Sequence, residues 1–180
     1  MAGADGITEE GRKAIVDVLN KAIQIEYGMI LNYPRILDQI KNIDKSQSEE
    51  FTVNLERLGK DSFRHATVIS RLIEDLGGKP AFDMVVVDVM ADVHSMLVEQ
   101  LGKEKLAAAA YKEARFIAEN NQAKEPKIFG KFLGKGRDSE KGVRGSVLID
   151  TLKRIEMDEV SHIKRVENLL IQMNINPEDK

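Results

Sequence analysis

The sequence predicts an all-α protein, a four-helix bundle with one long crossover between its second and third helices. Four long segments carry apolar residues spaced alternately three and four apart, which is the pattern of a helical bundle seam. No segment has convincing strand character, and the connections between the segments differ in length. The predicted helices span about 8–43, 48–76, 90–120 and 143–173, within a single domain that covers residues 1–180.

The first predicted helix has a clear start and the second a clear end. Thr8 is a suitable N-cap, and the acidic Glu9 and Glu10 follow it, where the positive end of the helix dipole favours them. Gly77-Gly78 stops the second helix, and a proline lies just beyond.

Each helix has one inner stripe, which is expected to form the core. The first two stripes are Val18, Ala22, Glu26, Met29 and Tyr33, and then Phe51, Leu55, Leu58, Ser62, His65, Ile69, Leu72 and Leu76. The third and fourth are Leu97, Leu101, Glu104, Ala108 and Tyr111, and then Leu148, Leu152, Ile155, Glu159, His162, Val166, Leu169 and Met173.

Two connections between the helices are long. Residues 79–89, KPAFDMVVVDV, can reach ~40 Å when extended, which suits a crossover along the bundle and leaves the second and third helices parallel. The segment 121–142 is an insertion rich in Lys and Gly. A flap, a docking loop and a solvated surface insertion remain open for it.

Composition excludes several classes of function. The chain has no cysteine, so disulfides, thiol catalysis and Cys-ligated zinc or iron are excluded. A net charge of −3 gives no reason to expect nucleic acid or an anionic membrane as a partner. No run approaches the ~18 apolar residues of a membrane span, and the N-terminal residues have no export signal. We therefore expect a cytoplasmic protein.

Six polar residues occupy seam positions where a bundle needs apolar ones. They are Glu26, Ser62, His65, Glu104, Glu159 and His162. A buried carboxylate costs several kcal/mol unless it meets a cation or dense hydrogen bonding.

These polar residues belong to a helical hairpin that occurs twice. Its first helix carries a Glu and, seven residues later, a Tyr; its second carries an Asp and, four residues later, a His. The copies are Glu26, Tyr33, Asp61 and His65, and then Glu104, Tyr111, Asp158 and His162. In the second copy Glu159 lies three residues before the His, on the same helix face, so the two side chains can hold one cation together. Mixed carboxylate and imidazole ligands suit iron or manganese.

With its "EYGMILNY", "EKLAAAAY" and "DEVSH" segments, the chain resembles the ferritin-like diiron-carboxylate superfamily, nearest the rubrerythrin and bacterioferritin type. The resemblance implies that Glu26 and His65 are terminal ligands of one metal. It implies that Glu104 and His162 are those of the other, with Glu159 as one of two bridging carboxylates.

The second bridge of the family falls at Ser62, where this chain has no carboxylate. Four carboxylates balance two divalent cations, whereas three leave one positive charge uncompensated, which weakens the second metal. Asp61 is a candidate substitute, although its short side chain leaves open whether it reaches the site. Tyr33 and Tyr111 are expected to hydrogen-bond ligand carboxylates, and Asp158 to lie beside the ligands.

The resemblance implies a non-haem oxidoreductase that acts on dioxygen or peroxide, or oxidises ferrous iron. The expected cofactor is a pair of irons, with manganese, zinc or a single metal as alternatives. Without a Cys-ligated rubredoxin module, the electrons must come from an external donor. A homodimer is expected. The alternative is a non-catalytic or single-metal protein with a degenerate site, which the serine at position 62 favours.

Overall fold

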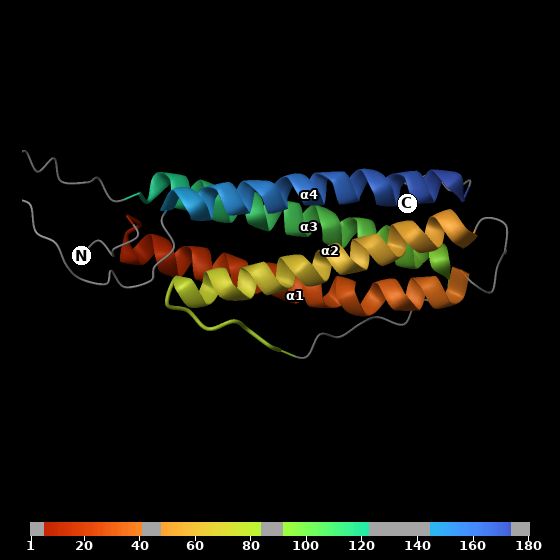
Figure 1. Cartoon of the computed structure of the whole chain (residues 1–180), viewed down its shortest axis with the longest axis horizontal. Coiled ribbons are helices and arrows are strands. Elements are labelled where there is room, and N and C mark those ends of the chain that lie inside the picture. Colours follow the sequence, from red (N-terminus) through yellow and green to blue (C-terminus); the bar gives the residue numbers. More distant parts are fainter. Residues whose placement is uncertain (1–5, 41–47, 84–91, 123–144, 174–180) are drawn as a thin grey trace, which may run out of the picture.

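Four long helices account for most of the chain in a computed structural model, which describes residues 6–40, 48–83, 92–122 and 145–173 (Figure 1). They are α1 (Glu9–Ile40), α2 (Ser48–Asp75), α3 (Val93–Asn120) and α4 (Gly145–Gln172). The predicted four-helix bundle is therefore confirmed. Residues 123–144, which hold most of the predicted insertion, and residues 84–91 of the crossover lie outside the described residues.

The helices alternate in direction around the bundle. Helices α2 and α3 both run from the right to the left of Figure 1, while α1 and α4 run the opposite way. Helix α1 packs against α2 and α3, and α4 packs closely against α3. The remaining neighbours, α2 and α4, are the most loosely packed pair. Parallel α2 and α3 require a connection that spans the length of the bundle, as the sequence predicted.

Local backbone chemistry sets the helix ends. The Gly11 amide donates to Thr8 Oγ1 at 3.1 Å, so Thr8 caps α1 as expected. At the end of α2, Gly77 adopts a φ of 81°, and the amides of Gly77 and Gly78 donate to Glu74 and Ile73 carbonyls at 2.9 and 2.8 Å. This pattern is a Schellman motif, which favours glycine at the left-handed position.

One end of the bundle is closed by contact between the start of α1 and the end of α3. Ile7 forms an isolated antiparallel bridge with Gln122, and the Thr8 amide donates to the Asn121 carbonyl at 3.0 Å. A Cβ atom on Gly11 would lie 2.5 Å from the Asn121 Cβ, so only glycine permits this approach.

The predicted inner stripes form the core. Nearly all of their residues are buried; Ala108 and Met173 are half-buried. The apolar residues at each end of the stripes enclose the polar positions at mid-helix. None of the helices in the described ranges is long and apolar enough to cross a membrane.

Candidate metal centre

Five ionisable side chains from all four helices meet in the middle of the core. Glu26 comes from α1, His65 from α2, Glu104 from α3, and Glu159 and His162 from α4; all five residues are buried. Their seam positions turn them inward, because residues three or four apart share one helix face. Burial of three carboxylates is costly without compensating positive charge, so the arrangement calls for cations or protons.

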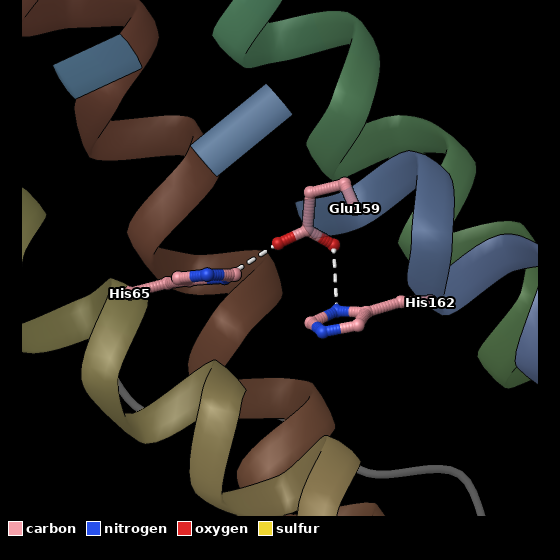
Figure 2. A group of neighbouring side chains, drawn as sticks. All are labelled: His65, Glu159 and His162. Carbon is pink, nitrogen blue, oxygen red and sulfur yellow. Dashed lines mark ion pairs between the residues drawn. The ribbon is translucent and has the colours of Figure 1, made fainter. Parts of the chain in front are cut away.

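Glu159 lies between the two histidines (Figure 2). Its Oε1 atom is 2.6 Å from His65 Nδ1, and its Oε2 atom is 3.5 Å from His162 Nδ1. The two imidazole rings are stacked with their centroids 5.5 Å apart. One atom from each of the three side chains lies within 4.8 Å of the others, close enough to ligate a shared cation.

A second carboxylate faces each histidine. Glu26 Oε1 lies 3.5 Å from His65 Nδ1, and Glu104 Oε2 lies 3.4 Å from His162 Nδ1. The site thus has two halves, each with one imidazole and one carboxylate of its own, and Glu159 belongs to both. All five residues predicted as ligands are brought together; their binding of metal stays a prediction.

The two buried tyrosines hold the outer carboxylates across the α1–α3 interface. The Tyr111 hydroxyl donates to Glu26 Oε1 at 2.6 Å, and the Tyr33 hydroxyl donates to Glu104 Oε1. Burial and the nearby carboxylates raise the pKa of both tyrosines well above the ordinary value, so both keep their protons and act as donors.

Asp61 and Asp158 lie on the other side of the histidines. Asp158 Oδ2 is 3.4 Å from His65 Nε2, and Asp61 Oδ2 is 3.4 Å from His162 Nε2. Each aspartate therefore reaches the histidine of the opposite helix, from the side away from Glu159. A carboxylate on Nε2 favours a proton there and leaves the Nδ1 lone pair for a metal. The Asp61 carboxylate thus meets His162 at Nε2, whereas Glu104 and Glu159 face the Nδ1 atom of the same ring.

Ser62 is fully buried, and its Oγ atom has no hydrogen-bond partner among the described residues. The serine lies three residues before His65, as Glu159 does before His162. The centre thus contains three carboxylates, as the sequence indicated, and the position where a second bridging carboxylate was expected holds the short neutral side chain of Ser62.

The residues fit a metal pair in their donor atoms. Six buried atoms of the five side chains have no hydrogen bond of acceptable geometry within the described residues: Glu26 Oε2, Glu104 Oε2, both Glu159 oxygens, and Nδ1 of His65 and His162. Buried polar atoms are rarely left unpaired, and six of the eleven such atoms in the described residues belong to the predicted ligands. Carboxylate oxygens and imidazole nitrogens are the donors that iron and manganese accept.

In the metal-free protein, protons compensate the carboxylates. Burial alone would lower the pKa of His65 and His162, but the adjacent carboxylates outweigh burial and raise each pKa to about 10. Burial raises the pKa of Glu159 to about 8, assisted by the neighbouring Glu26 and Glu104. A divalent cation must displace these protons, so metal binding and proton release are coupled.

Sequence reasoning missed two polar residues next to the centre. Gln100 and Asn32 are both fully buried, and the Asn32 amide donates to Gln100 Oε1 at 3.3 Å. Gln100 in turn donates to Glu104 Oε1 at 3.5 Å. Gln100 precedes Glu104 by one helical turn, so a seam extended by that turn would have included it. Neither residue has a polar equivalent in the other hairpin, where Ala22 and Ala110 stand.

The fold is a ferritin-like four-helix bundle, similar to those of two solved proteins. A ferritin-like, diiron-carboxylate protein from Bacillus anthracis str. Ames aligns with a TM-score of 0.68 over 89% of this chain and 97% of that one, at 20% identity. A bacterioferritin from Desulfovibrio desulfuricans, solved to show its diiron site, aligns with a TM-score of 0.60 over 89% and 80% of the two chains, also at 20% identity. No model of a protein family matches the chain, and no curated protein does.

Proposed function

We propose that the chain is a non-haem di-iron, or di-manganese, oxidoreductase of the rubrerythrin-like type, acting on dioxygen or peroxide or oxidising ferrous iron. The observation that carries this proposal is the position of Glu159, whose two oxygens each face Nδ1 of a different buried histidine. A carboxylate held in this way fits a bridge between two cations. The similarity of the fold to diiron-carboxylate proteins supports the same choice of metal.

Each half of the centre has its own ligands in this proposal. Glu26 and His65 would hold one cation, Glu104 and His162 would hold the other, and Glu159 would contribute to both halves. When bound, such a pair of ions supplies the electrons that reduce dioxygen or peroxide.

The other residues fix the ligands. Tyr111 and Tyr33 orient the outer carboxylates, and the aspartates hold the histidines through Nε2. The apolar core on both sides of the centre excludes bulk water and strengthens every charge interaction inside. Electrons return from an external donor, since the chain has no cysteine to hold a rubredoxin-type iron.

Anaerobic reconstitution with ferrous iron tests the proposal. We expect about two irons per chain, the second bound more weakly, and consumption of about one peroxide for every two ferrous ions oxidised. Glu159→Gln should abolish the turnover. Glu156→Gln is the matched control, because this residue lies on the same helix and pairs with Arg115 at 2.8 Å, outside the centre.

The second candidate is a protein that holds one cation, or none, for a structural role. The neutral, buried Ser62 favours it, because three carboxylates leave a pair of divalent cations short of one negative charge. One metal per chain with no peroxide consumption would support this candidate. Two irons with turnover would support the oxidoreductase.

A further inference from the structure

The loosely packed seam between α2 and α4 contains a pocket that reaches the candidate metal centre. Its volume is about 330 Å³, and its lining includes the buried His65 together with Arg64, Arg154 and Asp158. On the opposite side, between α1 and α3, the buried Tyr33 and Tyr111 close the centre. The α2–α4 seam is therefore the polar side of the bundle nearest the ligands.

A continuous series of polar contacts runs along this seam from solvent to Glu159. The Arg64 side chain is 58% exposed, and its Nη2 atom lies 2.9 Å from Asp158 Oδ2 and 3.2 Å from Asp61 Oδ1. The side chains of Asp158 and Asp61 are 43% and 24% exposed. The histidines that they contact are 2–3% exposed, and Glu159 is fully buried.

Arg64 is the outermost member of this series and has no counterpart in the second hairpin. The residue before the histidine is Arg64 in α2 and Ser161 in α4. A single guanidinium therefore joins two aspartates that come from different helices. It ties α2 to α4, the most loosely packed neighbours in the bundle, and it places a positive charge at the mouth of the pocket.

We infer that the α2–α4 seam is the access route for the metal cations and that Arg64, by joining Asp61 to Asp158, is a latch that closes it. The inference rests on the proposed metal centre. The two aspartates offer an incoming cation a first pair of carboxylates once the guanidinium swings away. The exposed position of Arg64 allows this movement without disturbance of the core.

Cobalt(II) uptake and release test the latch without reference to turnover. Capture is measured by stopped-flow absorbance when cobalt is mixed with the full chain, from which metal and chelator have been removed. Release is measured by transfer of the bound cobalt to excess EDTA. Arg64→Ala should accelerate capture and release alike, each by about tenfold, because loss of the guanidinium charge speeds capture and loss of the link between α2 and α4 speeds release. Arg64→Lys keeps the charge, so its rates of capture and release should fall between those of wild type and Arg64→Ala. Circular dichroism confirms that each variant is folded.

Arg154→Ala is the matched control. Arg154 is exposed, lines the same pocket and makes no ion pair within the described residues, so its removal deletes an equal charge but no link between helices. Loss of a positive charge alone attracts cations, which speeds capture and slows release. Release that quickens in Arg64→Ala but not in Arg154→Ala supports the latch.

Three outcomes overturn the inference. If Arg64→Ala captures cobalt faster than wild type but releases it at the wild-type rate or more slowly, the guanidinium acts only through its charge. If wild type and variants all fail to bind cobalt, the proposed metal centre is wrong and the latch falls with it. Binding that is unchanged in affinity and rate by Arg64→Ala removes the latch alone and leaves the centre standing.

Discussion

The Tyr111 hydroxyl on α3 donates a 2.6 Å hydrogen bond to Glu26 on α1, so a tyrosine of one hairpin fixes a predicted ligand of the other. Tyr111→Phe keeps the ring and leaves the Glu26 oxygen buried without a donor. An unpaired buried acceptor costs about 1–3 kcal/mol. The melting temperature of the chelated protein should fall by roughly 3–10 °C, measured by circular dichroism.

The matched control is Tyr27→Phe on α1. The Tyr27 ring packs against Phe82 with a centroid separation of 5.9 Å, and its hydroxyl has no hydrogen bond in the described part of the chain. Loss of the Tyr27 hydroxyl should therefore change the melting temperature little. Equal shifts in the two variants would mean that the Tyr111 hydroxyl contributes nothing specific.

The seam pattern predicted the core of this protein because it depends only on the period of each helix. Glu26, His65 and Glu104 are buried where that period places them. The predicted contact between each tyrosine and a ligand carboxylate is also present. Which tyrosine meets which glutamate depends on how far the helices are staggered and rotated against each other, and a single sequence does not encode this directly.

The contacts outside the ligands were harder to predict for the same reason. Asp61 lies one turn before His65, which made it a candidate for the missing bridge, yet its carboxylate contacts His162 on another helix. Arg64 was overlooked because an arginine at a helix surface is ordinary. Its importance arises only from the approach of Asp158 across the α2–α4 seam.

Metal should stabilise the fold through Glu159. Ligand linkage gives about 2.7 kcal/mol at a free metal concentration 100 times the Kd, so the wild-type melting temperature should rise by several degrees with added Mn²⁺ or anaerobic Fe²⁺. Glu159→Gln should lose most of this rise, because an amide provides no negative charge to bridge two cations. Differential scanning calorimetry with and without chelator measures the rise in melting temperature for both proteins.

Glu156→Gln on the same helix should retain the full response to metal, even though the Arg115 ion pair is lost. A wild-type melt that is the same after thorough chelation as before would contradict the prediction. The prediction would also be contradicted if added metal raised the melting temperature of Glu159→Gln as much as that of wild type.

The chelated protein should lose stability as the pH rises from about 6.5 to 10. The pKa of His65 and His162 is raised from 6.5 to about 10 in the fold, so their stabilising contribution is complete below 6.5 and is lost as the pH passes through 10. The pKa of Glu159 is raised to about 8, so its ionisation adds a cost in the same direction.

Thermal melts at pH 6.5, 8 and 9.5 measure this effect, in a range where ordinary carboxylates are already ionised and most lysines are still charged. Metal-saturated protein is the comparison. Because cations displace the protons, its stabilisation by metal should grow over the same range. A chelated protein whose melting temperature is flat between pH 6.5 and 9.5 would show that the two histidines are neutral in the metal-free core.

Ser62→Glu should convert a weak second metal site into a tight one. The new carboxylate stands three residues before His65, as Glu159 does before His162, and supplies the fourth negative charge that balances two divalent cations. Mn²⁺ titration followed by metal counting after gel filtration should give close to one retained metal in wild type and close to two in the variant. Thermal melts that check the folding of Ser62→Glu should be made with metal present, because four carboxylates repel one another in its absence.

Asp61→Asn separates this explanation from the one in which Asp61 already bridges. Since the Asp61 carboxylate contacts His162 at Nε2, its loss should weaken metal binding about 10- to 100-fold, as for other partners of ligating histidines, and leave the Ser62→Glu gain intact. A complete loss of the second metal in Asp61→Asn, with no gain in Ser62→Glu, would identify Asp61 as the bridge. Two tightly held metals in both wild type and Asp61→Asn would mean that the ligand set is different from the one proposed.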